Sequence, residues 1–350
     1  MGIPTVRDRV VQTCIKMALE PFYEHQFSSH SYGFRRNVGA RQAVEQAKTY
    51  VESGYEVVVD IDLARFFDTI NHDKLIDLLR CNVSDSRVLR LIGMSLRSGI
   101  LTGSSSSSEP VGSPQGSPLS PLLGNILLNE LDQELERRGH KFCRYAYDIA
   151  IFVRTTAAGN RVLQSTSTYL ERRLKLRVNR DKSMVALAKQ VSYLGFTVLK
   201  NTIAISKRSI DAAMRRIKEL TPRGCHEDLY QTMQRVNKWY RGYVGYYGFG
   251  QYPAQLHKLE AHIRRRMRSR IIAHKKKRRH LFRALRQRGV RYRTAKRSVY
   301  GNDGRWAMSK SPGMHRAYPN LWFKRDLGQR IVSDEKRITW RPVKQWPKLV

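Results

Sequence analysis

The segment Tyr55-Glu56-Val57-Val58-Val59-Asp60-Ile61-Asp62 decides how the first part of the chain folds. Its β-branched run predicts a buried strand, and the acidic residues at its end predict carboxylates at the edge of a sheet. Residues 142–153 read Phe-Cys-Arg-Tyr-Ala-Tyr-Asp-Ile-Ala-Ile-Phe-Val and predict two strands that meet at a tight turn around Tyr147 and Asp148. Carboxylates at strand ends are typical of metal-dependent phosphoryl transfer, although turn formers of this kind are more common.

Helical spacing of apolar residues extends outward from these strands. It predicts two helices within residues 1–50, with a break at residues 31–34, and further helices at 72–80, 86–97, 119–131 and 158–175. Residues 192–198 and 202–205 are predicted to form a hairpin, and the serine run 104–108 a hairpin or a loop tip. Beyond residue 206 the pattern changes to basic amphipathic helices at about 207–220, 226–247 and 253–273. We therefore expect an α+β part over 1–206, a helical part over 207–274 and a basic segment over 275–350.

The charge of the chain points to a polyanionic partner. The 350 residues include 41% hydrophobic residues, enough for packed domains, and carry a formal net charge of +36. Residues 201–350 hold about 38 Lys and Arg against about 9 Asp and Glu, whereas the first 100 residues are nearly balanced. A field of this sign attracts nucleic acid, so we expect the last part of the chain to bind it.

Four cysteines, Cys14, Cys81, Cys143 and Cys225, stand far apart without a Cys-x-x-Cys pair. They predict neither a disulfide framework nor a zinc site, and they favour a reducing, cytoplasmic setting. No apolar run reaches the length of a membrane span, and residues 1–20 lack the uninterrupted apolar stretch of a signal peptide. We therefore expect a soluble protein.

Several phrases in one order resemble the reverse transcriptase palm, and in detail the proteins encoded by bacterial group II introns. The phrases are residues 2–9 (Gly-Ile-Pro-Thr-Val-Arg-Asp-Arg), 31–35 (Ser-Tyr-Gly-Phe-Arg), 60–72, 112–125, 144–146, 182–183 and 193–196 (Tyr-Leu-Gly-Phe). Further on, residues 239–243 (Trp-Tyr-Arg-Gly-Tyr) resemble the family's maturase or thumb domain, and residues 304–310 resemble its C-terminal DNA-facing segment. The resemblance implies a right-hand polymerase palm, an antiparallel sheet with packed helices, followed by an α-helical thumb/maturase domain and a basic C-terminal segment.

The resemblance also implies a site that holds two Mg²⁺ ions between a primer 3′-hydroxyl and the incoming dNTP. By it, Asp62 and Asp148 are metal ligands together with the backbone carbonyl of Ile61. Nucleotide contacts are implied for four further residues, Phe67 as a steric gate, Gln115, Gly116 and Lys182. From the residues alone, Phe67 can equally be a core side chain, and Lys182 can be a solvated charge.

The sequence departs from the family pattern at the second strand. The family motif is Tyr-Ala-Asp-Asp, and this chain has Tyr145-Ala146-Tyr147-Asp148. A neutral phenol is a poor magnesium ligand, so we expect no detectable DNA synthesis. Met1 falls inside a phrase that follows the fingers in the family, which predicts an N-terminally truncated member; a decayed fragment, one half of a split gene and a late start codon all remain open. The tail has no paired cysteines after Cys225, so a His-Asn-His endonuclease is not expected.

The basic helices are expected to contact group II intron RNA, with a DNA target and primer as further partners of an active enzyme. Ten basic side chains are candidates for phosphate contacts: Arg215, Arg216, Lys238, Arg241, Arg264, Arg265, Lys275, Lys276, Lys277 and Arg278. Trp239 and Tyr243 are expected in the core. Three functions remain open at this point: an RNA-directed DNA polymerase, a maturase that binds intron RNA and assists splicing without polymerising, and a product with neither activity.

Overall fold

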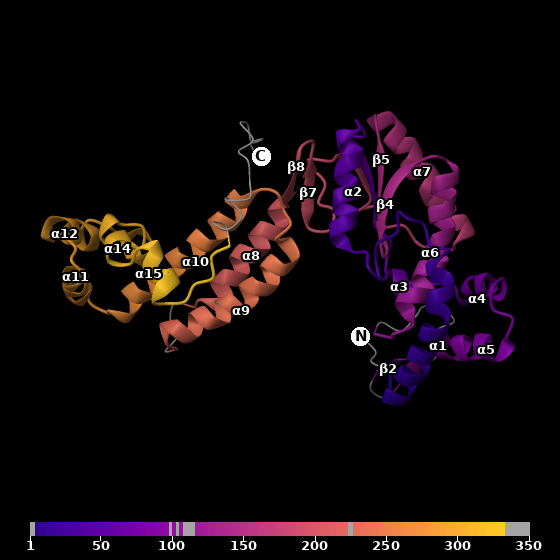
Figure 1. The fold of residues 1–350 in the computed structure, drawn as a ribbon, viewed down its shortest axis with the longest axis horizontal. Helices are drawn as coiled ribbons and strands as arrows, with labels where there is room; N and C mark the ends of the chain where they lie inside the picture. Colours follow the sequence, from indigo (N-terminus) through magenta and orange to yellow (C-terminus); the bar gives the residue numbers. More distant parts are fainter. Residues whose placement is uncertain (1–3, 98–99, 103–104, 108–115, 223–226, 333–350) are drawn as a thin grey trace. The chain divides into compact units, whose positions relative to one another are not determined.

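The computed structural model describes residues 4–97, 100–102, 105–107, 116–222 and 227–332 (Figure 1). The chain forms two compact units, Met1–Ile203 and Ala204–Val350. The division lies close to the expected boundary at residue 206, and the expected division after residue 274 stays a prediction. Each unit is described by itself below.

An antiparallel sheet forms the centre of the first unit, as the two strand-like segments predict. Its strand order is β4-β5-β1-β6, with β1 (Val57–Ile61), β4 (Lys141–Tyr145), β5 (Asp148–Val153) and β6 (Met184–Leu187). All pairs are antiparallel, and β1 lies between β5 and β6. Strand β6 was not predicted; its four residues are apolar, but the structure leaves them exposed or half-buried at the edge of the sheet. The palm expected from the resemblance is therefore present.

The two faces of the sheet have different characters because side chains alternate along a strand. Val57, Val59 and Ile61 of β1 belong to an apolar core that also contains leucines of α6 (Ser120–Arg137) and α7 (Thr156–Arg173). The opposite face carries Asp60, and Phe152 on this face lies 5.4 Å by ring centroid from Tyr50 of α2 (Ala40–Glu52). Figure 1 shows α2 and α7 on either side of the strands.

The remaining helices of the first unit are three that follow the predicted spacing and one short helix, at residues 66–69, that was not predicted. They are α1 (Val6–Glu24), α3 (Phe66–Thr69), α4 (His72–Arg80) and α5 (Ser86–Arg97), and a short hairpin joins β2 (Ile100–Thr102) to β3 (Ser105–Ser107). Helices at 72–80 and 86–97 are thus confirmed, and part of the serine run lies in a strand. Asn71 caps α4, because its side chain accepts a hydrogen bond from the Lys74 N–H at 2.9 Å.

The predicted strand over residues 192–198 is wrong at its start. Strand β7 (Phe196–Leu199) begins four residues later and pairs with β8 (Thr202–Ile205). Leu194 and Gly195 both have positive φ, 50° and 79°, and Tyr193 and Phe196 exchange two backbone hydrogen bonds of 2.9 Å across them. Two positive φ values in a row make a tight reversal of the chain, so the apolar pattern there belongs to a turn.

Beyond the end of β8 at Ile205, the regular elements of the second unit are all helices in the residues described. It contains α8 (Lys207–Leu220), α9 (Leu229–Tyr247), α10 (Pro253–His274), α11 (Arg278–Gln287), α12 (Tyr292–Tyr300), α13 (Gly304–Met308), α14 (Pro312–Ala317) and α15 (Asn320–Arg325). The first three agree with the basic amphipathic helices predicted. The residues from 278 to 325 had been expected only as a basic segment, but they fold into five helices around buried Leu281, Leu285, Val299, Met314 and Phe323. Among the residues described, no helix is long and apolar enough to cross a membrane.

Candidate functional site

Carboxylates gather at one end of the palm sheet. Ile61 pairs with Ile149, so Asp62 and Asp148 follow as the next opposed residues and share the face that carries Asp60. Burial, followed by the charges of Asp148 and Asp62, raises the pKa of Asp60 to about 6. Burial and the charge of Asp62 also raise the pKa of Asp148. The three side chains therefore repel one another, and a cation at this edge would relieve that repulsion.

Asp62 is held in place by the segment that precedes β6. Its backbone N–H donates to Ser183 Oγ at 3.1 Å, and its carbonyl oxygen accepts from the Asn179 N–H at 2.9 Å. Lys182 Nζ lies 3.9 Å from Asp62 Oδ2, with the Lys182 side chain 71% exposed. An ion pair as open as this contributes little to stability, so Lys182 is available for other anions. The residue implied to contact a triphosphate therefore lies beside the first-strand carboxylate.

Tyr147 packs against the two phenylalanines that follow Asp62. Its ring centroid lies 5.9 Å from that of Phe66, with the planes 30° apart, and 6.0 Å from that of Phe67, with the planes 87° apart. Tyr147 is 37% exposed, Phe66 is buried and Phe67 is half-buried. The proposed steric gate Phe67 is thus in ring contact with the side chain that replaces the family's aspartate.

These residues do not fit a pair of magnesium ions. Two divalent cations need several hard oxygen ligands, whereas a phenol is a poor ligand for Mg²⁺ and the ring of Tyr147 packs against Phe66 and Phe67. No group of three His, Cys, Asp or Glu side chains placed to hold a metal ion exists in the described parts of the chain. Ile61, whose backbone carbonyl the resemblance implies as a metal ligand, ends β1 with its side chain buried.

The loop before α6 is only partly within the structure. Gln115 lies outside the described residues, whereas Gly116 is exposed and has a φ of 108° that favours glycine. The next residue, Ser117, is buried and donates from Oγ to Gln12 Oε1 at 2.9 Å. Gln12 in turn donates to Ser95 Oγ at 2.8 Å. Helices α1 and α5 thereby anchor the end of the loop that the resemblance places near the nucleotide.

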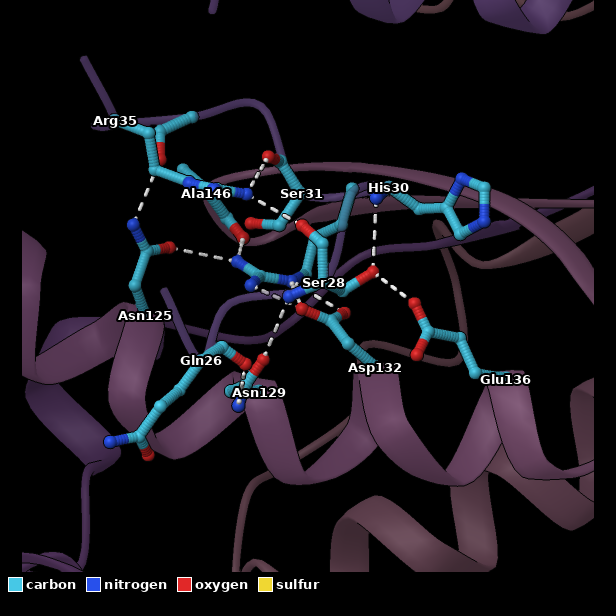
Figure 2. A network of polar contacts seen from close by, with 12 residues as sticks. Gln26, Ser28, His30, Ser31, Arg35, Asn125, Asn129, Asp132, Glu136 and Ala146 are labelled. Atoms are coloured by element: carbon cyan, nitrogen blue, oxygen red, sulfur yellow. Dashed lines mark hydrogen bonds and ion pairs between the residues drawn. The ribbon is translucent and has the colours of Figure 1, made fainter. Parts of the chain in front are cut away.

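A buried polar network, which the sequence analysis missed, holds the turn that carries Tyr147 (Figure 2). Arg144 and Asp132 are both fully buried, and the Arg144 guanidinium donates to both Asp132 oxygens, at 2.8 Å and 3.0 Å from Nε and at 2.5 Å from Nη2. Arg144 Nη1 also donates to Asn125 Oδ1 at 2.9 Å and to the carbonyl oxygen of Ala146 at 2.8 Å. Ala146 has a φ of 56°, so this bond fixes a backbone conformation that alanine rarely adopts.

The segment over residues 28–35 closes the same network from the other side. Asn125 Nδ2 donates to the carbonyl oxygen of Gly33 at 2.9 Å, and the Tyr32 N–H donates to the carbonyl oxygen of Arg144 at 2.8 Å. A Cβ atom at Gly33 would lie 2.1 Å from the backbone nitrogen of Ala146, so only glycine allows this approach. Arg35 Nη1 donates to the carbonyl oxygen of Ser31 at 2.9 Å (Figure 2). The sequence contains one sign of this network, the single arginine Arg144 within an apolar strand, because a buried charge requires a partner.

Most of the basic residues expected to bind phosphate are on the surface of the second unit. Those exposed or half-exposed are Arg215 and Arg216 of α8, Lys238 and Arg241 of α9, Arg265 of α10, Lys275, Lys276 and Lys277 between α10 and α11, and Arg278 at the start of α11. Arg216 also pairs with Glu219 at 2.7 Å. Arg265 lies with its guanidinium carbon 3.7 Å from the ring centroid of Trp306, which leaves one face of the guanidinium stacked.

Arg264 is a correction to the expected surface. It is only 3% exposed, and the neighbouring Arg266, Arg268 and Arg270 of α10 are buried too. Their guanidinium groups donate to backbone carbonyl oxygens: Arg266 to Thr221, Arg268 to Tyr318 and Arg270 to Glu227. Thr221 and Tyr318 are the C-cap residues of α8 and α14, where carbonyl groups lack partners within the helix, whereas Glu227 precedes the N-cap of α9. A basic run that resembles a phosphate contact is therefore largely structural.

The aromatic residues of α9 also differ from expectation. Tyr240 is fully buried, whereas Trp239 and Tyr243, which were expected in the core, are half-buried. The Tyr240 hydroxyl donates to Glu260 Oε1 at 2.8 Å. The predicted core positions were therefore wrong in detail, because the buried face of α9 runs through Met233, Val236 and Tyr240 and places Trp239 and Tyr243 at its margin.

An antiparallel sheet with carboxylates at one end, followed by a basic helical unit, defines a right-hand polymerase palm with a helical domain. Residues 1–198 match the family described as reverse transcriptase (RNA-dependent DNA polymerase), and residues 210–289 match the group II intron, maturase-specific domain. The chain belongs to the reverse transcriptase family, in its group II intron reverse transcriptase/maturase branch.

Relatives are similar over parts of their length. Protein YkfC of Escherichia coli K12 is 31% identical over 253 residues, which are 61% of this chain and 65% of that protein. The group II intron-encoded protein LtrA of Lactococcus lactis is 33% identical over 101 residues, 29% of this chain and 17% of LtrA. A solved structure of telomerase from Candida tropicalis, in complex with a fragment of telomeric RNA, aligns with 95% of this chain and 56% of the telomerase chain. The TM-score of this alignment is 0.45, and the sequence identity is 10%. The chain thus spans less than two thirds of these proteins.

Proposed function

We propose that this protein binds group II intron RNA and assists its splicing, and that it does not synthesise DNA. The observation that carries the proposal is the position of Tyr147. Its ring lies on Phe66 and Phe67, at the place where the family motif supplies a carboxylate beside Asp62 and Asp148. The remaining carboxylates are too few to hold two divalent cations, so this protein lacks the two-metal site that DNA synthesis in the family requires.

Charge and exposure support the RNA-binding half of the proposal. The maturase-specific match over residues 210–289 covers α8, α9, α10 and α11. Arg215, Lys238 and Arg241 are exposed there, and Lys276, Lys277 and Arg278 extend the basic surface. Cations on a folded helical surface bind a phosphate backbone by releasing its counterions, which gives an affinity that falls steeply with salt.

The alternative function is an RNA-directed DNA polymerase that uses Mg²⁺, dNTPs, a primer and a DNA target. Two observations favour it: the family itself, and the pairing of Ile61 with Ile149, which brings the adjacent Asp62 and Asp148 to the same end of the sheet. The backbone contacts that hold the turn do not involve the side chain of Tyr147. The scaffold of a polymerase site is therefore retained although one ligand is missing.

Two assays test the proposal together. Splicing of a group II intron RNA from the same genome is measured at low magnesium with and without protein, and primer extension is measured on an RNA template. We expect faster splicing and no extension by the natural protein, and measurable extension only after Tyr147→Asp. Tyr147→Phe is the matched control, because it keeps the ring and adds no carboxylate. Equal extension by the natural protein and Tyr147→Asp would refute the proposed loss of synthesis.

A further inference from the structure

Helices α11 and α12 present a cluster of three aromatic rings on the outside of the second unit. Phe282 of α11 lies 5.5 Å by ring centroid from Tyr292 and 6.2 Å from Tyr300, both on α12. Tyr292 is 56% exposed and Tyr300 48% exposed, and Phe282 beneath them is half-buried. Large aromatic side chains are usually buried, so two tyrosines this open on one helix call for an explanation.

The two helices that carry these rings are strongly cationic. Neither α11 nor α12 contains an acidic residue, and residues 275–332 contain only Asp303 and Asp326. Lys296 is four residues from both Tyr292 and Tyr300 and therefore shares their face of α12. Further exposed basic side chains on the two helices are Arg278, Arg279, Arg283, Arg293 and Arg297. Like charges this dense repel one another unless a polyanion covers them.

We propose that the surface formed by Phe282, Tyr292, Tyr300 and Lys296, here called the α11–α12 platform, binds an unpaired strand of RNA by stacking bases on its tyrosines. Bases in a duplex are stacked on one another and offer no free face, whereas unpaired bases stack on aromatic rings while cations contact the backbone. Helix α11 lies within the maturase-specific match, and α12 lies beyond it. The inference rests on the RNA-binding half of the proposed function and assigns it a class of RNA and a mode of contact.

The alternative is that the rings only hold α11 against α12. Leucine keeps the apolar packing between the helices but cannot stack on a base, whereas phenylalanine keeps the packing and the stacking. Substitutions by these two residues therefore separate the two roles. We therefore compare Tyr292→Leu/Tyr300→Leu with Tyr292→Phe/Tyr300→Phe in the full chain. Phe22→Leu on α1, where Phe22 is 49% exposed, is the control for loss of an exposed ring elsewhere. Thermal unfolding of each variant shows whether it is folded.

The binding assay uses RNA of about 12 nucleotides with 2-aminopurine at its centre, a length within the range of roughly 4–16 nucleotides that single-strand sites occupy. We expect Tyr292→Leu/Tyr300→Leu to weaken binding about tenfold or more and to abolish quenching of 2-aminopurine, because each stacked base contributes substantially to affinity. The slope of log affinity against log salt should stay unchanged in that variant, since no charge is lost. In Lys296→Gln the slope should drop by about 1, which corresponds to one lost phosphate contact. The phenylalanine pair and Phe22→Leu should bind as the natural protein does.

Three results would overturn the inference. They are equal binding and quenching by a folded leucine pair, equally tight binding of the same sequence as a duplex, and tighter binding of the corresponding DNA strand. Failure of the proposed function is distinguishable from these outcomes. If the proposed function fails, the natural protein binds no RNA and does not accelerate splicing. If only the inference about the α11–α12 platform fails, the natural protein still binds RNA, but at a different surface.

Discussion

At the scale of single residues, Arg144 determines the shape of the turn before Asp148. Its guanidinium contacts Asp132, Asn125 and the carbonyl oxygen of Ala146 in a fully buried site. Arg144→Met leaves Asp132 buried without its partner, so we expect the free energy of unfolding to fall by about 3–5 kcal/mol. Urea unfolding followed by circular dichroism measures this loss.

Two further variants test that explanation of Arg144. Adding Asp132→Leu removes the orphaned charge and should recover part of the stability, since an ion pair and an apolar pair of similar size are often close in free energy. Arg137→Met removes an arginine whose side chain is 71% exposed, so it should cost much less stability than Arg144→Met. Equal losses for Arg144→Met and Arg137→Met would contradict the structural role of the network.

Gly33 makes a second prediction at this scale. A Cβ atom there would lie 2.1 Å from the Ala146 nitrogen and 2.9 Å from its Cα, and backbone atoms cannot move aside cheaply. Gly33→Ala should therefore destabilise the first unit by roughly 1–3 kcal/mol, the usual cost of overpacking. Gly242→Ala in α9, where a Cβ meets nothing within 4 Å, should instead stabilise its helix by up to about 1 kcal/mol. Thermal unfolding compares the two variants. An unfolding temperature that Gly33→Ala leaves unchanged would show that residues 28–35 move away from the turn at Ala146 at little cost.

At the scale of elements, the sequence predicts most of the helices and the central strands because their apolar patterns are local. The strand over residues 57–61 and the helices at 72–80 and 86–97 are examples. The Arg144 network could not be predicted in the same way, because its partner Asn125 bonds to Gly33, 92 residues away along the chain. The buried Arg264 was misjudged for a related reason: a run of arginines gives no sign of the carbonyl groups that other helices bring to it. The α11–α12 platform likewise depends on two helices that meet only in the fold.

The exposed face of α8 and α9 gives a prediction that separates surface cations from buried ones. Arg215→Gln/Lys238→Gln/Arg241→Gln removes three exposed charges, so RNA affinity should fall and the slope of log affinity against log salt should drop by roughly 2–3. Arg264→Gln should leave that slope unchanged while lowering stability, since Arg264 is buried. Filter binding over a range of salt concentrations measures both. A triple variant with the natural slope would place the RNA contacts elsewhere.

At the scale of the whole molecule, the net charge of +36 is concentrated in the second unit, and all five tryptophans lie there as well. Tryptophan fluorescence therefore reports the unfolding of that unit alone. Two histidines in it, His262 and His315, have lowered pKa values, first through burial and then through nearby arginines, Arg266 beside His262 and Arg268 beside His315. The folded unit thus disfavours their protonated forms.

The sign of the resulting pH dependence follows from the two states. A histidine whose pKa is lowered on folding takes up its proton in the unfolded chain first, so stability is lost as the pH falls through about 6.5. We expect the fluorescence-detected unfolding temperature to decrease between pH 7.5 and pH 5.5. His262→Gln should flatten this decrease, because the side chain then stays neutral in both states. Since Asp60 in the first unit has a raised pKa and acts with the opposite sign, the effect should be weaker when circular dichroism follows both units together. A fluorescence transition independent of pH, or one that His262→Gln leaves equally steep, would show that these histidines are hydrated in the folded protein.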